Sequence, residues 1–270
     1  MTSETTEMKF NNNSLFKWYP LIKDVVATPK TVMIPMKHWF SSLEDAIDKG
    51  TDPEMIRLVT KSKEAVQELG GLYPVFLRSD QTSNKHMWER SCFIQNEKQI
   101  DDAIANILEF TMMAFGLSFG GVVVREFLLL PHEFTAFKGM PVSKEFRFFI
   151  KNGKLLCWHP YWFPSCMTWG VKEKDWLSKL REVQRLYPSD LEVLTDKALD
   201  ISKAVEPLNV EDNFWSIDFC WSKEYGWTVT DMAMGKNSYH YSTCPNAPEE
   251  MKQYPNPEEI PTKKEFLDYV

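Results

Sequence analysis

The chain has 270 residues and 43% hydrophobic content, so it is long enough to bury a core in one large domain or two small ones. Its net charge of −7 argues against a general nucleic-acid-binding surface, although it is compatible with a local basic cleft. No apolar run approaches the roughly 20 residues of a membrane-spanning helix, and the first residues show no signal-peptide pattern.

The N-terminal third mixes loose and regular segments. Residues 1–13 are polar and are expected to form a loose arm, and the aromatics, prolines and β-branched residues of 15–36 predict short strands and turns. Two helices are expected at 41–50 and 52–70, because each begins with a capping residue, Ser or Asp, and ends at glycine.

The middle of the chain predicts a strand, a loop, a helix and a second strand. Residues 73–80 read YPVFLRSD, a strand pattern, whereas 79–91 are polar without an apolar period and predict a loop. Isoleucines and a leucine at helical spacing predict a helix over 97–116. The run VVVREFLLL at 122–130 predicts the next strand, which carries an Arg-Glu pair.

A hairpin is expected at 145–158, because Asn-Gly at 152–153 is a strong signal for a two-residue turn. This turn pairs Arg147 with Trp158 and places alternate side chains on opposite faces. One face is expected to hold Phe146, Phe148 and Ile150 with Leu155 and Cys157, and the other Glu145, Arg147, Phe149 and Lys151. Arg147 then either contacts a phosphate through its planar fork or forms a surface pair with Glu145 beside Trp158.

Helices interrupted at Tyr187-Pro188 are expected over 172–206, followed by a second hairpin over 213–235. A four-residue loop at 223–226 pairs Ser222 with Trp227, Cys220 with Val229 and Asp218 with Asp231. Two carboxylates facing each other destabilise a sheet unless a cation lies between them, and Mg²⁺ is a cation that carboxylates hold. The alternative is that both acids are solvated strand residues.

Helices interleaved with antiparallel hairpins, rather than regular βαβ units, predict an α+β fold. The sequence contains no glycine-rich phosphate loop and no serine in a nucleophile elbow. Several strands nevertheless bring charged residues toward one region, a set that suits a nucleotide and its metal ion. This set comprises Arg78, Arg125, Glu126, Arg147, Asp218 and Asp231, with Phe127 and Leu128 as an apolar pair that could sandwich a base.

Other polar residues have two readings. Glu133, next to His132, is either a ribose-binding residue or part of a solvated loop, and Lys138 and Lys144 either close over phosphates or are surface charges. Lys236 follows the second hairpin and, with His240, could contact the γ-phosphate or the acceptor. His159, Tyr161 and Trp162 line a substrate mouth or only fill space.

The cysteines Cys92, Cys157, Cys166, Cys220 and Cys244 are odd in number, scattered and without Cys-x-x-Cys spacing. This pattern, without a secretion signal, favours a reducing cytoplasm over a disulfide framework. We therefore expect a cytoplasmic protein, and the spacing argues against a zinc site.

Four stretches, in this order, resemble the ATP-grasp superfamily and in particular the cell division cycle protein 123 family. They are FKWYPLIKDVVATPKTVMIPM, YPVFLRSDQTSNKHMW, VVVREFLLL followed by KEFRFFIKNGKL, and SIDFCWSKEYGWTVTDMAMG. The resemblance spans roughly residues 15 to 241. It implies an ATP-grasp fold, in which two α+β lobes with antiparallel sheets enclose a nucleotide cleft.

The resemblance also implies a division of the chain and a set of roles. The expected parts are an N-terminal segment (1–70), a small lobe (71–130), a large lobe with the metal-binding hairpin (131–245) and a proline-rich tail (246–270). Arg78 and Arg147 would contact phosphate, Glu126, Phe127 and Leu128 would meet adenine, and Asp218 and Asp231 would bind Mg²⁺.

Two departures from the family pattern concern the charged positions. Arg78 stands where the family has a lysine, and Asp231-Met232-Ala233-Met234 replaces an Asp-Phe-Asn-Pro ending. Because Ala233 cannot ligate a metal, a second ion would need another group, such as Asn237 or Ser238.

Two functions follow from the resemblance. The first is an ATP- and Mg²⁺-dependent ligase, which activates a carboxylate as an acyl phosphate for attack by an amine. The alternative is a non-catalytic, ATP-dependent assembly chaperone for a subunit of translation initiation factor 2. The Trp-Tyr-Pro stretch favours the chaperone, and the missing Asn-Pro ending weakens it.

Overall fold

The computed structural model describes residues 10–114, 118–167, 171–241 and 244–254, and the chain divides into two compact units. Unit 1 comprises Met1–Lys17 and Lys30–Phe127, and unit 2 comprises Trp18–Pro29 and Leu128–Val270. The four-part division expected from the sequence stays a prediction. Among the described residues, no helix has both the length and the apolarity needed to cross a membrane.

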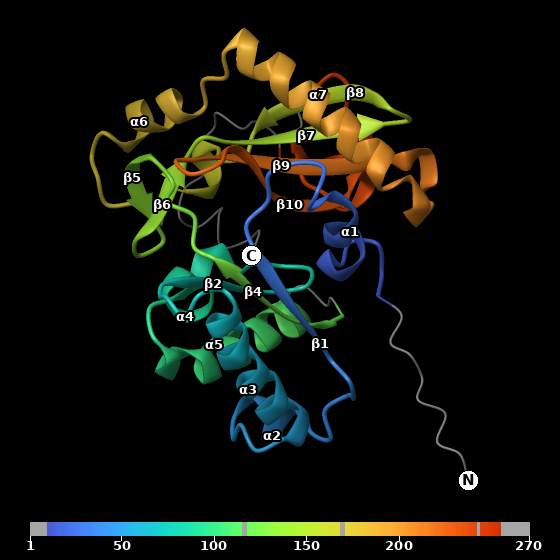
Figure 1. Ribbon diagram of the computed structural model, residues 1–270. Helices are drawn as coiled ribbons and strands as arrows, with labels where there is room; N and C mark the ends of the chain where they lie inside the picture. The colour runs from blue at the N-terminus through green and yellow to red at the C-terminus, as the bar shows by residue number, and fades with distance from the viewer. Residues whose placement is uncertain (1–9, 115–117, 168–170, 242–243, 255–270) are drawn as a thin grey trace. The chain divides into compact units, whose positions relative to one another are not determined.

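Unit 1 is built on a four-stranded antiparallel sheet in the order β1-β4-β2-β3, with helices α3 and α5 packed against it (Figure 1). Its strands are β1 (Thr31–Pro35), β2 (Val75–Ser79), β3 (Phe93–Ile94) and β4 (Gly121–Glu126). Its helices are α2 (Leu43–Ile47), α3 (Pro53–Glu68), α4 (Trp88–Ser91) and α5 (Ile100–Glu109), which continues as a π-helical turn over Phe110–Ala114. Helix α1 (Leu15–Ile22) begins in unit 1 and ends in unit 2.

The valine run of β4 separates the two faces of this sheet. Val122 and Val124 belong to the hydrophobic core with residues of α3 and α5. Because side chains alternate along a strand, Val123 and Arg125 lie on the opposite face. Arg78 of β2 shares that face, since it is paired with Val123. The charged residues of β2 and β4 therefore lie away from the helices and the core.

Gly121 lies where β4 meets β1 with the least space. Its φ is +146°, and a Cβ there would lie 2.3 Å from the backbone oxygen of Ile34. We expect Gly121→Ala to lower the free energy of unfolding by about 2–3 kcal/mol, as backbone strain and collision add. Gly70→Ala, at φ +108° with no atom within 4 Å, is the matched control. In urea denaturation, equal losses for the two variants would refute the collision.

Unit 2 contains a four-stranded antiparallel sheet in the order β10-β9-β7-β8, a β5–β6 hairpin and a short parallel pair, β11 and β12. Its remaining strands and helices are β5 (His132–Ala136), β6 (Met140–Ser143), β7 (Glu145–Lys151), β8 (Lys154–Pro160), α6 (Trp176–Val183), α7 (Pro188–Ala204), β9 (Trp215–Ser222), β10 (Gly226–Met234), β11 (His240–Tyr241) and β12 (Lys252–Tyr254). The antiparallel hairpins and separate helices confirm the predicted α+β class.

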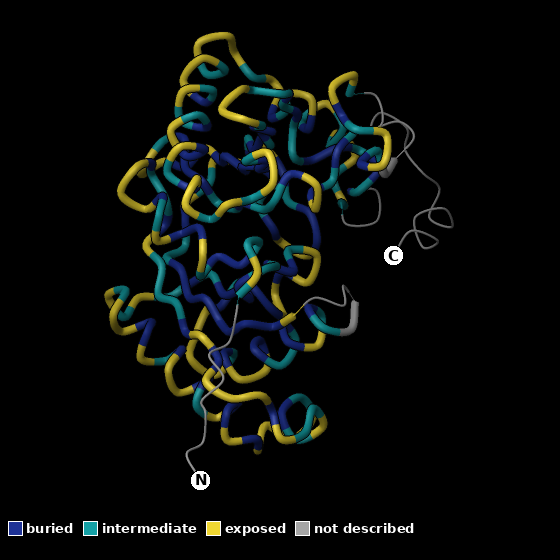
Figure 2. Tube along the Cα trace, turned by 90° about the vertical axis from the view of Figure 1, so that its right-hand side faces the viewer, coloured by how far each residue is buried: buried dark blue, intermediate teal, exposed yellow. Residues whose placement is uncertain are grey.

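Helix α7 covers one face of the unit 2 sheet. Trp227 of β10 packs against Phe146 of β7, with ring centroids 5.8 Å apart, and donates a hydrogen bond to Asp190 near the start of α7. Phe146 and Phe148 are fully buried, as the predicted alternation requires. Buried segments follow the strands in both units (Figure 2).

The first hairpin begins in the predicted register, with Lys151 opposite Lys154, but changes register after Ile150. A β-bulge on the β8 side then pairs Phe149 with Cys157 and Arg147 with His159. The predicted Arg147–Trp158 pair is therefore wrong. Trp158 instead stacks on Phe148, and Cys157 packs with Phe149 rather than on the face of Phe148.

The second hairpin shows the reverse. Its turn pairs Ser222 with Gly226, so the register predicted next to the loop is off by one residue. A bulge at Thr230 then restores the predicted pairing of Asp218 with Asp231. The acid pair is thus confirmed, although two local errors cancel to give it.

Four shorter expectations are wrong. Residues 15–22 form helix α1 rather than strands and turns, because Leu15, Trp18 and Ile22 bury one face of it. Residues 88–91 are helical around the buried Trp88 within the predicted loop. Met140, expected in a loop with Gly139 and Pro141, begins strand β6. The tail is not wholly on the surface, because Met251 packs with Phe149, Cys157 and Phe214. Residues 255–270 lie outside the described part.

Candidate functional site: a charged row across the unit 2 sheet

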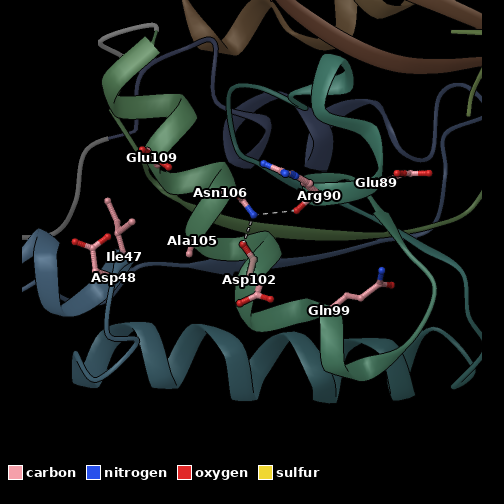
Figure 3. A pocket seen from close by; sticks show the side chains of 9 residues that line it. All are labelled: Ile47, Asp48, Glu89, Arg90, Gln99, Asp102, Ala105, Asn106 and Glu109. Carbon is pink, nitrogen blue, oxygen red and sulfur yellow. Dashed lines mark hydrogen bonds between the residues drawn. The ribbon is translucent and has the colours of Figure 1, made fainter. Parts of the chain in front are cut away.

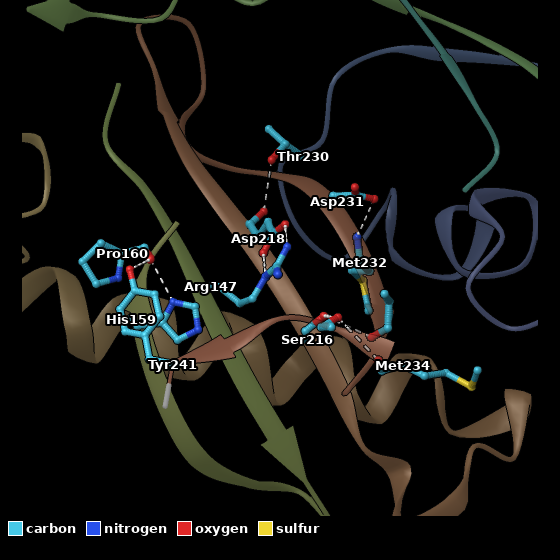
Figure 4. Close-up of polar contacts among 12 residues, drawn as sticks. Arg147, His159, Pro160, Ser216, Asp218, Thr230, Asp231, Met232, Met234 and Tyr241 are labelled. Atoms are coloured by element: carbon cyan, nitrogen blue, oxygen red, sulfur yellow. Dashed lines mark hydrogen bonds and ion pairs between the residues drawn. The ribbon is translucent and has the colours of Figure 1, made fainter. Parts of the chain in front are cut away.

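Four polar side chains in register cross the sheet of unit 2 on the face opposite α7. We call them the charged row; from β10 to β8 they are Asp231, Asp218, Arg147 and His159. Directly opposite residues of antiparallel strands point to the same face, so the hairpins place all four side chains side by side. Figure 4 shows Arg147 pointing at Asp218 from the neighbouring strand.

Arg147 and Asp218 form a two-pronged ion pair. The Nε and Nη2 atoms of Arg147 donate to the two carboxylate oxygens of Asp218 at 2.7 and 2.8 Å. The Asp218 side chain is 3% exposed and that of Arg147 15% exposed, so water screens the pair weakly. The Arg147 guanidinium also lies over the ring of Tyr161, 4.9 Å from its centroid. Two partners therefore fix its orientation.

The charge of Arg147 is maintained despite its burial. Burial alone would lower the pKa of the guanidinium, but attraction and hydrogen bonding from Asp218, with a further contribution from Asp231, raise that pKa above its ordinary value of 12.5. Arg147 is therefore a permanent positive charge beside two carboxylates.

Asp231 lies across from Asp218 at the end of the bulge on β10. One of its oxygens, Oδ1, accepts a hydrogen bond from the backbone N–H of Met232 at 3.0 Å. The hydroxyl of Thr230 donates to the backbone oxygen of Asp218 at 3.4 Å, which ties the bulge to β9. The bulge thus sets the position of Asp231 relative to the Arg147–Asp218 pair (Figure 4).

The next row along the same face contains Ala233 opposite Ser216. Alanine offers no metal ligand, but the hydroxyl of Ser216 forms a hydrogen bond with that of Ser238, which is 6% exposed. Of the two substitutes considered for the family asparagine, Ser238 therefore lies next to the position of Ala233. Asn237 is exposed on a 3₁₀ turn.

His159 ends the charged row and is buried against aromatic rings. Its ring stacks on Tyr241 at 4.1 Å between centroids, and its Nδ1 lies 2.8 Å from the backbone oxygen of Pro160. The Tyr241 hydroxyl donates to the same oxygen at 2.7 Å. Burial, with the positive charge of Arg147 as a lesser cause, lowers the pKa of His159 from 6.5 to about 3.

This shift makes stability depend on pH. The unfolded chain protonates His159 as pH falls below 6.5, whereas the folded chain keeps it neutral down to about 3. Stability from this group is therefore complete above pH 6.5 and falls as pH drops toward 3. We expect about 2 kcal/mol to be lost between pH 7 and pH 5.

Urea denaturation at the two pH values checks this expectation. His159→Gln should remove about 2 kcal/mol of the pH dependence, whereas His132→Gln, at an exposed position of the same unit, should leave it unchanged. The same pH dependence in wild type and His159→Gln would contradict the buried neutral imidazole.

Two predicted residues of unit 2 lie outside the charged row. Lys236 forms an exposed ion pair with Glu211, with 3.1 Å between Nζ and Oε2. Glu133 lines a pocket of about 300 Å³ together with Lys144, Tyr187 and the two tryptophans of the β9–β10 hairpin. Because Trp227 packs on Phe146, this pocket lies on the α7 side of the sheet. The catalytic role of Lys236 and the nucleotide role of Glu133 stay predictions.

The predicted residues of unit 1 gather around β2 and β4. The Nε of Arg125 donates to the hydroxyl of Thr31, and Arg78 is 2% exposed. Glu126 accepts the backbone N–H of Lys30 at 2.6 Å. Phe127 packs on Phe93 with ring centroids 5.1 Å apart, so the apolar pair expected to sandwich a base is an aromatic contact here, while Leu128 is buried in unit 2. Their nucleotide-binding roles stay predictions.

A pocket of about 520 Å³ lies among α2, α4 and α5 of unit 1 (Figure 3). The side chains at its edge are mostly acidic, with Arg90 as the basic exception, and Asn106 donates to the backbone oxygens of Arg90 and Asp102. It contains none of the predicted site residues, so the site hypothesis does not extend to it.

Sequence reasoning missed two contributors to the charged row. The bulge in β8 brings His159 opposite Arg147, and Tyr241, from a segment expected to be irregular, stacks on His159. The Asn-Gly turn gave the starting register but no signal for the bulge. No local pattern marks Tyr241 as a partner of β8.

Two α+β units with antiparallel sheets, one of which bears an acid pair beside an arginine, define the ATP-grasp class. The chain belongs to an ATP-grasp domain family, family 3 of its clade, whose model matches residues 68–250. This membership confirms the fold predicted from the resemblance. No curated protein sequence matches the chain.

Solved structures show the same fold. C-terminally truncated Cdc123 from Schizosaccharomyces pombe is 15% identical with a TM-score of 0.51, and the match covers 82% of this chain and 83% of that one. The D-alanine–D-alanine ligase from Bacillus anthracis, complexed with ATP, is 11% identical at a TM-score of 0.44, covering 83% of this chain and 55% of the ligase. The biotin carboxylase domain of 2-oxoglutarate carboxylase from Hydrogenobacter thermophilus, complexed with MgADP, is 14% identical at 0.47, with 82% and 39% covered.

Proposed function

We propose that the protein binds ATP with Mg²⁺ at the charged row and activates a carboxylate as an acyl phosphate for attack by an amine. The observation that carries this proposal is the placement of Asp218 and Asp231 side by side, next to the fixed positive charge of Arg147. Two unshielded carboxylates repel each other, so the arrangement favours a cation between them.

The donor set fits a hard divalent cation. An ionised carboxylate has about four lone-pair sites, so Asp218 can accept both hydrogen bonds of Arg147 and still ligate a metal ion. Asp231 adds a second carboxylate, and Mg²⁺ commonly takes one or two carboxylates with water and phosphate oxygens at its other positions. Bound there, Mg²⁺ would neutralise phosphate charge during transfer of the γ-phosphoryl group.

The protein's own residues would orient the substrates. Arg147 is held between Asp218 and Tyr161, so a phosphate oxygen that it contacts would be fixed in position at little entropic cost. Arg78 and Arg125 are proposed as further phosphate contacts, and Glu126 with Phe127 as the adenine-binding hinge. In the reaction the carboxylate oxygen attacks the γ-phosphorus and ADP leaves; the amine then attacks the acyl carbon and phosphate leaves.

The alanine at 233 supports a site with one principal ion. Ser216 and Ser238, the hydroxyls nearest that position in the fold, bond to each other and are weak ligands for Mg²⁺ compared with a carboxylate. We therefore propose one tightly bound Mg²⁺, with any second ion held mainly by the nucleotide.

A non-catalytic assembly chaperone for a translation initiation factor 2 subunit is the second candidate. It is supported by the nearly end-to-end match with Cdc123, which covers 82% of this chain and 83% of that one. The Trp-Tyr-Pro stretch adds less, because Trp18 is fully buried and Tyr19 is 6% exposed, so packing within α1 accounts for both aromatics. All five cysteines are free, which agrees with the proposed cytoplasmic location.

One assay separates the two candidates. The full chain is incubated with ATP, Mg²⁺ and a small-molecule cell extract, with hydroxylamine added to trap an acyl phosphate as a hydroxamate. A ligase releases ADP and yields a hydroxamate only with extract. A chaperone releases neither, and instead retains the initiation factor 2 subunit in an ATP-dependent pull-down. Absence of Mg²⁺–ATP binding in calorimetry would contradict both.

A further inference from the structure

Three metal-binding side chains meet beside the charged row in unit 2. They are Cys157 of β8, His240 of β11 and Cys244, and their ligand atoms all lie within 4.8 Å of one another. The sulfur of Cys157 is 2.8 Å from Nε2 of His240. His240 is fully buried, Cys157 is 9% exposed and Cys244 is half-buried. The sequence expectation that scattered cysteines argue against zinc took no account of this convergence.

The geometry points to a site for Zn²⁺ with Cys157, His240 and Cys244 as ligands. Two thiolates and an imidazole are a donor set that Zn²⁺ takes in tetrahedral sites, whereas hard ions such as Mg²⁺ prefer oxygen. The fourth position would hold water or a further ligand. This site is separate from the one proposed for Mg²⁺–ATP, because it uses no residue of the charged row.

The required adjustment is small. In a tetrahedral site with Zn–S bonds of about 2.3 Å and Zn–N bonds of about 2.0 Å, the sulfur and nitrogen atoms lie about 3.5 Å apart. The Cys157–His240 distance of 2.8 Å therefore has to open by less than ~1 Å. Cys244 lies at the partly exposed edge, which gives an ion a route from solvent.

The surroundings indicate what the ion would do. Phe149 stacks on His240 at 4.2 Å between ring centroids and packs with Cys157 and Met251. The three ligands thus join β8 to the segment that carries β11 and β12. Since Tyr241 follows His240 and stacks on His159, a bound ion would hold this segment against the end of the charged row.

Cobalt titration of the reduced, metal-stripped full chain tests the site. We expect one equivalent of Co²⁺ to bind with thiolate-to-cobalt charge-transfer absorption and tetrahedral d–d bands, and Zn²⁺ to displace it. Cys244→Ser should weaken binding by more than about 100-fold, since loss even of an outer-sphere partner costs roughly 10–100-fold. Cys166→Ser, at another half-buried cysteine of unit 2, should leave binding unchanged.

Three results would overturn the proposal: no charge-transfer band in the wild-type chain, equal loss in Cys166→Ser and Cys244→Ser, or a Cys157–Cys244 disulfide in protein purified without reductant that persists under mild reduction. Because Cys157→Ser alters a buried position, the half-buried Cys244 is the primary variant. Zinc measured by mass spectrometry after expression should agree, with about one equivalent in wild type and less in Cys244→Ser.

Discussion

Replacing Asp218 by alanine is expected to destabilise the protein by about 3–5 kcal/mol, the loss typical of a buried ion pair that is broken from one side. The reason is the guanidinium left behind. Arg147 is 15% exposed and receives both of its short carboxylate hydrogen bonds from Asp218. The variant therefore retains a largely desolvated positive charge with its principal counter-charge removed.

The matched control removes both charges. The double variant Arg147→Met/Asp218→Leu replaces the pair by apolar side chains of similar size, and we expect it to recover most of the loss, because the cost comes from the unpaired charge rather than from the absent attraction. Urea denaturation of the wild type and the two variants measures these differences. A single variant as stable as wild type, or a double variant no better than the single one, would show that the pair is not buried as described.

Asp231→Asn is expected to separate function from stability. Removing one of two neighbouring carboxylates relieves like-charge repulsion, and Asp231 is only half-buried, so the free energy of unfolding should change by less than about 1 kcal/mol. Affinity for Mg²⁺–ATP should fall by more than about 100-fold, since an amide is a much poorer ligand for Mg²⁺ than a carboxylate.

Calorimetric titration with Mg²⁺–ATP measures this loss, with Asp212→Asn as the control. Asp212 is an exposed acid of the same unit, paired with Lys151, and its φ of +57° suits asparagine. The control should bind as the wild type does. If Asp231→Asn also binds unchanged, Asp231 is not a metal ligand and the proposed site is wrong.

The parts of the fold that follow from local signals were predictable. Asp52 accepts the backbone N–H groups of Glu54 and Met55, so the Asp-Pro start of α3 works as the sequence indicated. The Asn-Gly turn also produced its hairpin. Helix α1 was missed, because Pro20 and the aromatic residues suggested an irregular segment, whereas packing of Trp18 and Ile22 decides the outcome.

The charged row was predictable only in part, because β-bulges set its register. Neither the bulge beside Leu156 nor the one at Thr230 has a signature in the sequence. The prediction of Asp218 opposite Asp231 succeeded because an error in the loop and the bulge cancelled. The Arg147–Trp158 prediction failed because nothing compensated for its bulge. That Arg147 pairs with Asp218 depends on the order β9-β7, which hairpin counting does not provide.

The central claim is that a divalent ion and a nucleotide bind at the acid pair next to Arg147. A crystal structure with Mn²⁺ and ADP, with anomalous differences measured at the manganese edge, tests it most directly. The account predicts a manganese peak bonded to carboxylate oxygens of both Asp218 and Asp231, with a phosphate oxygen in contact with Arg147. A manganese–nucleotide complex bound without either carboxylate would contradict it.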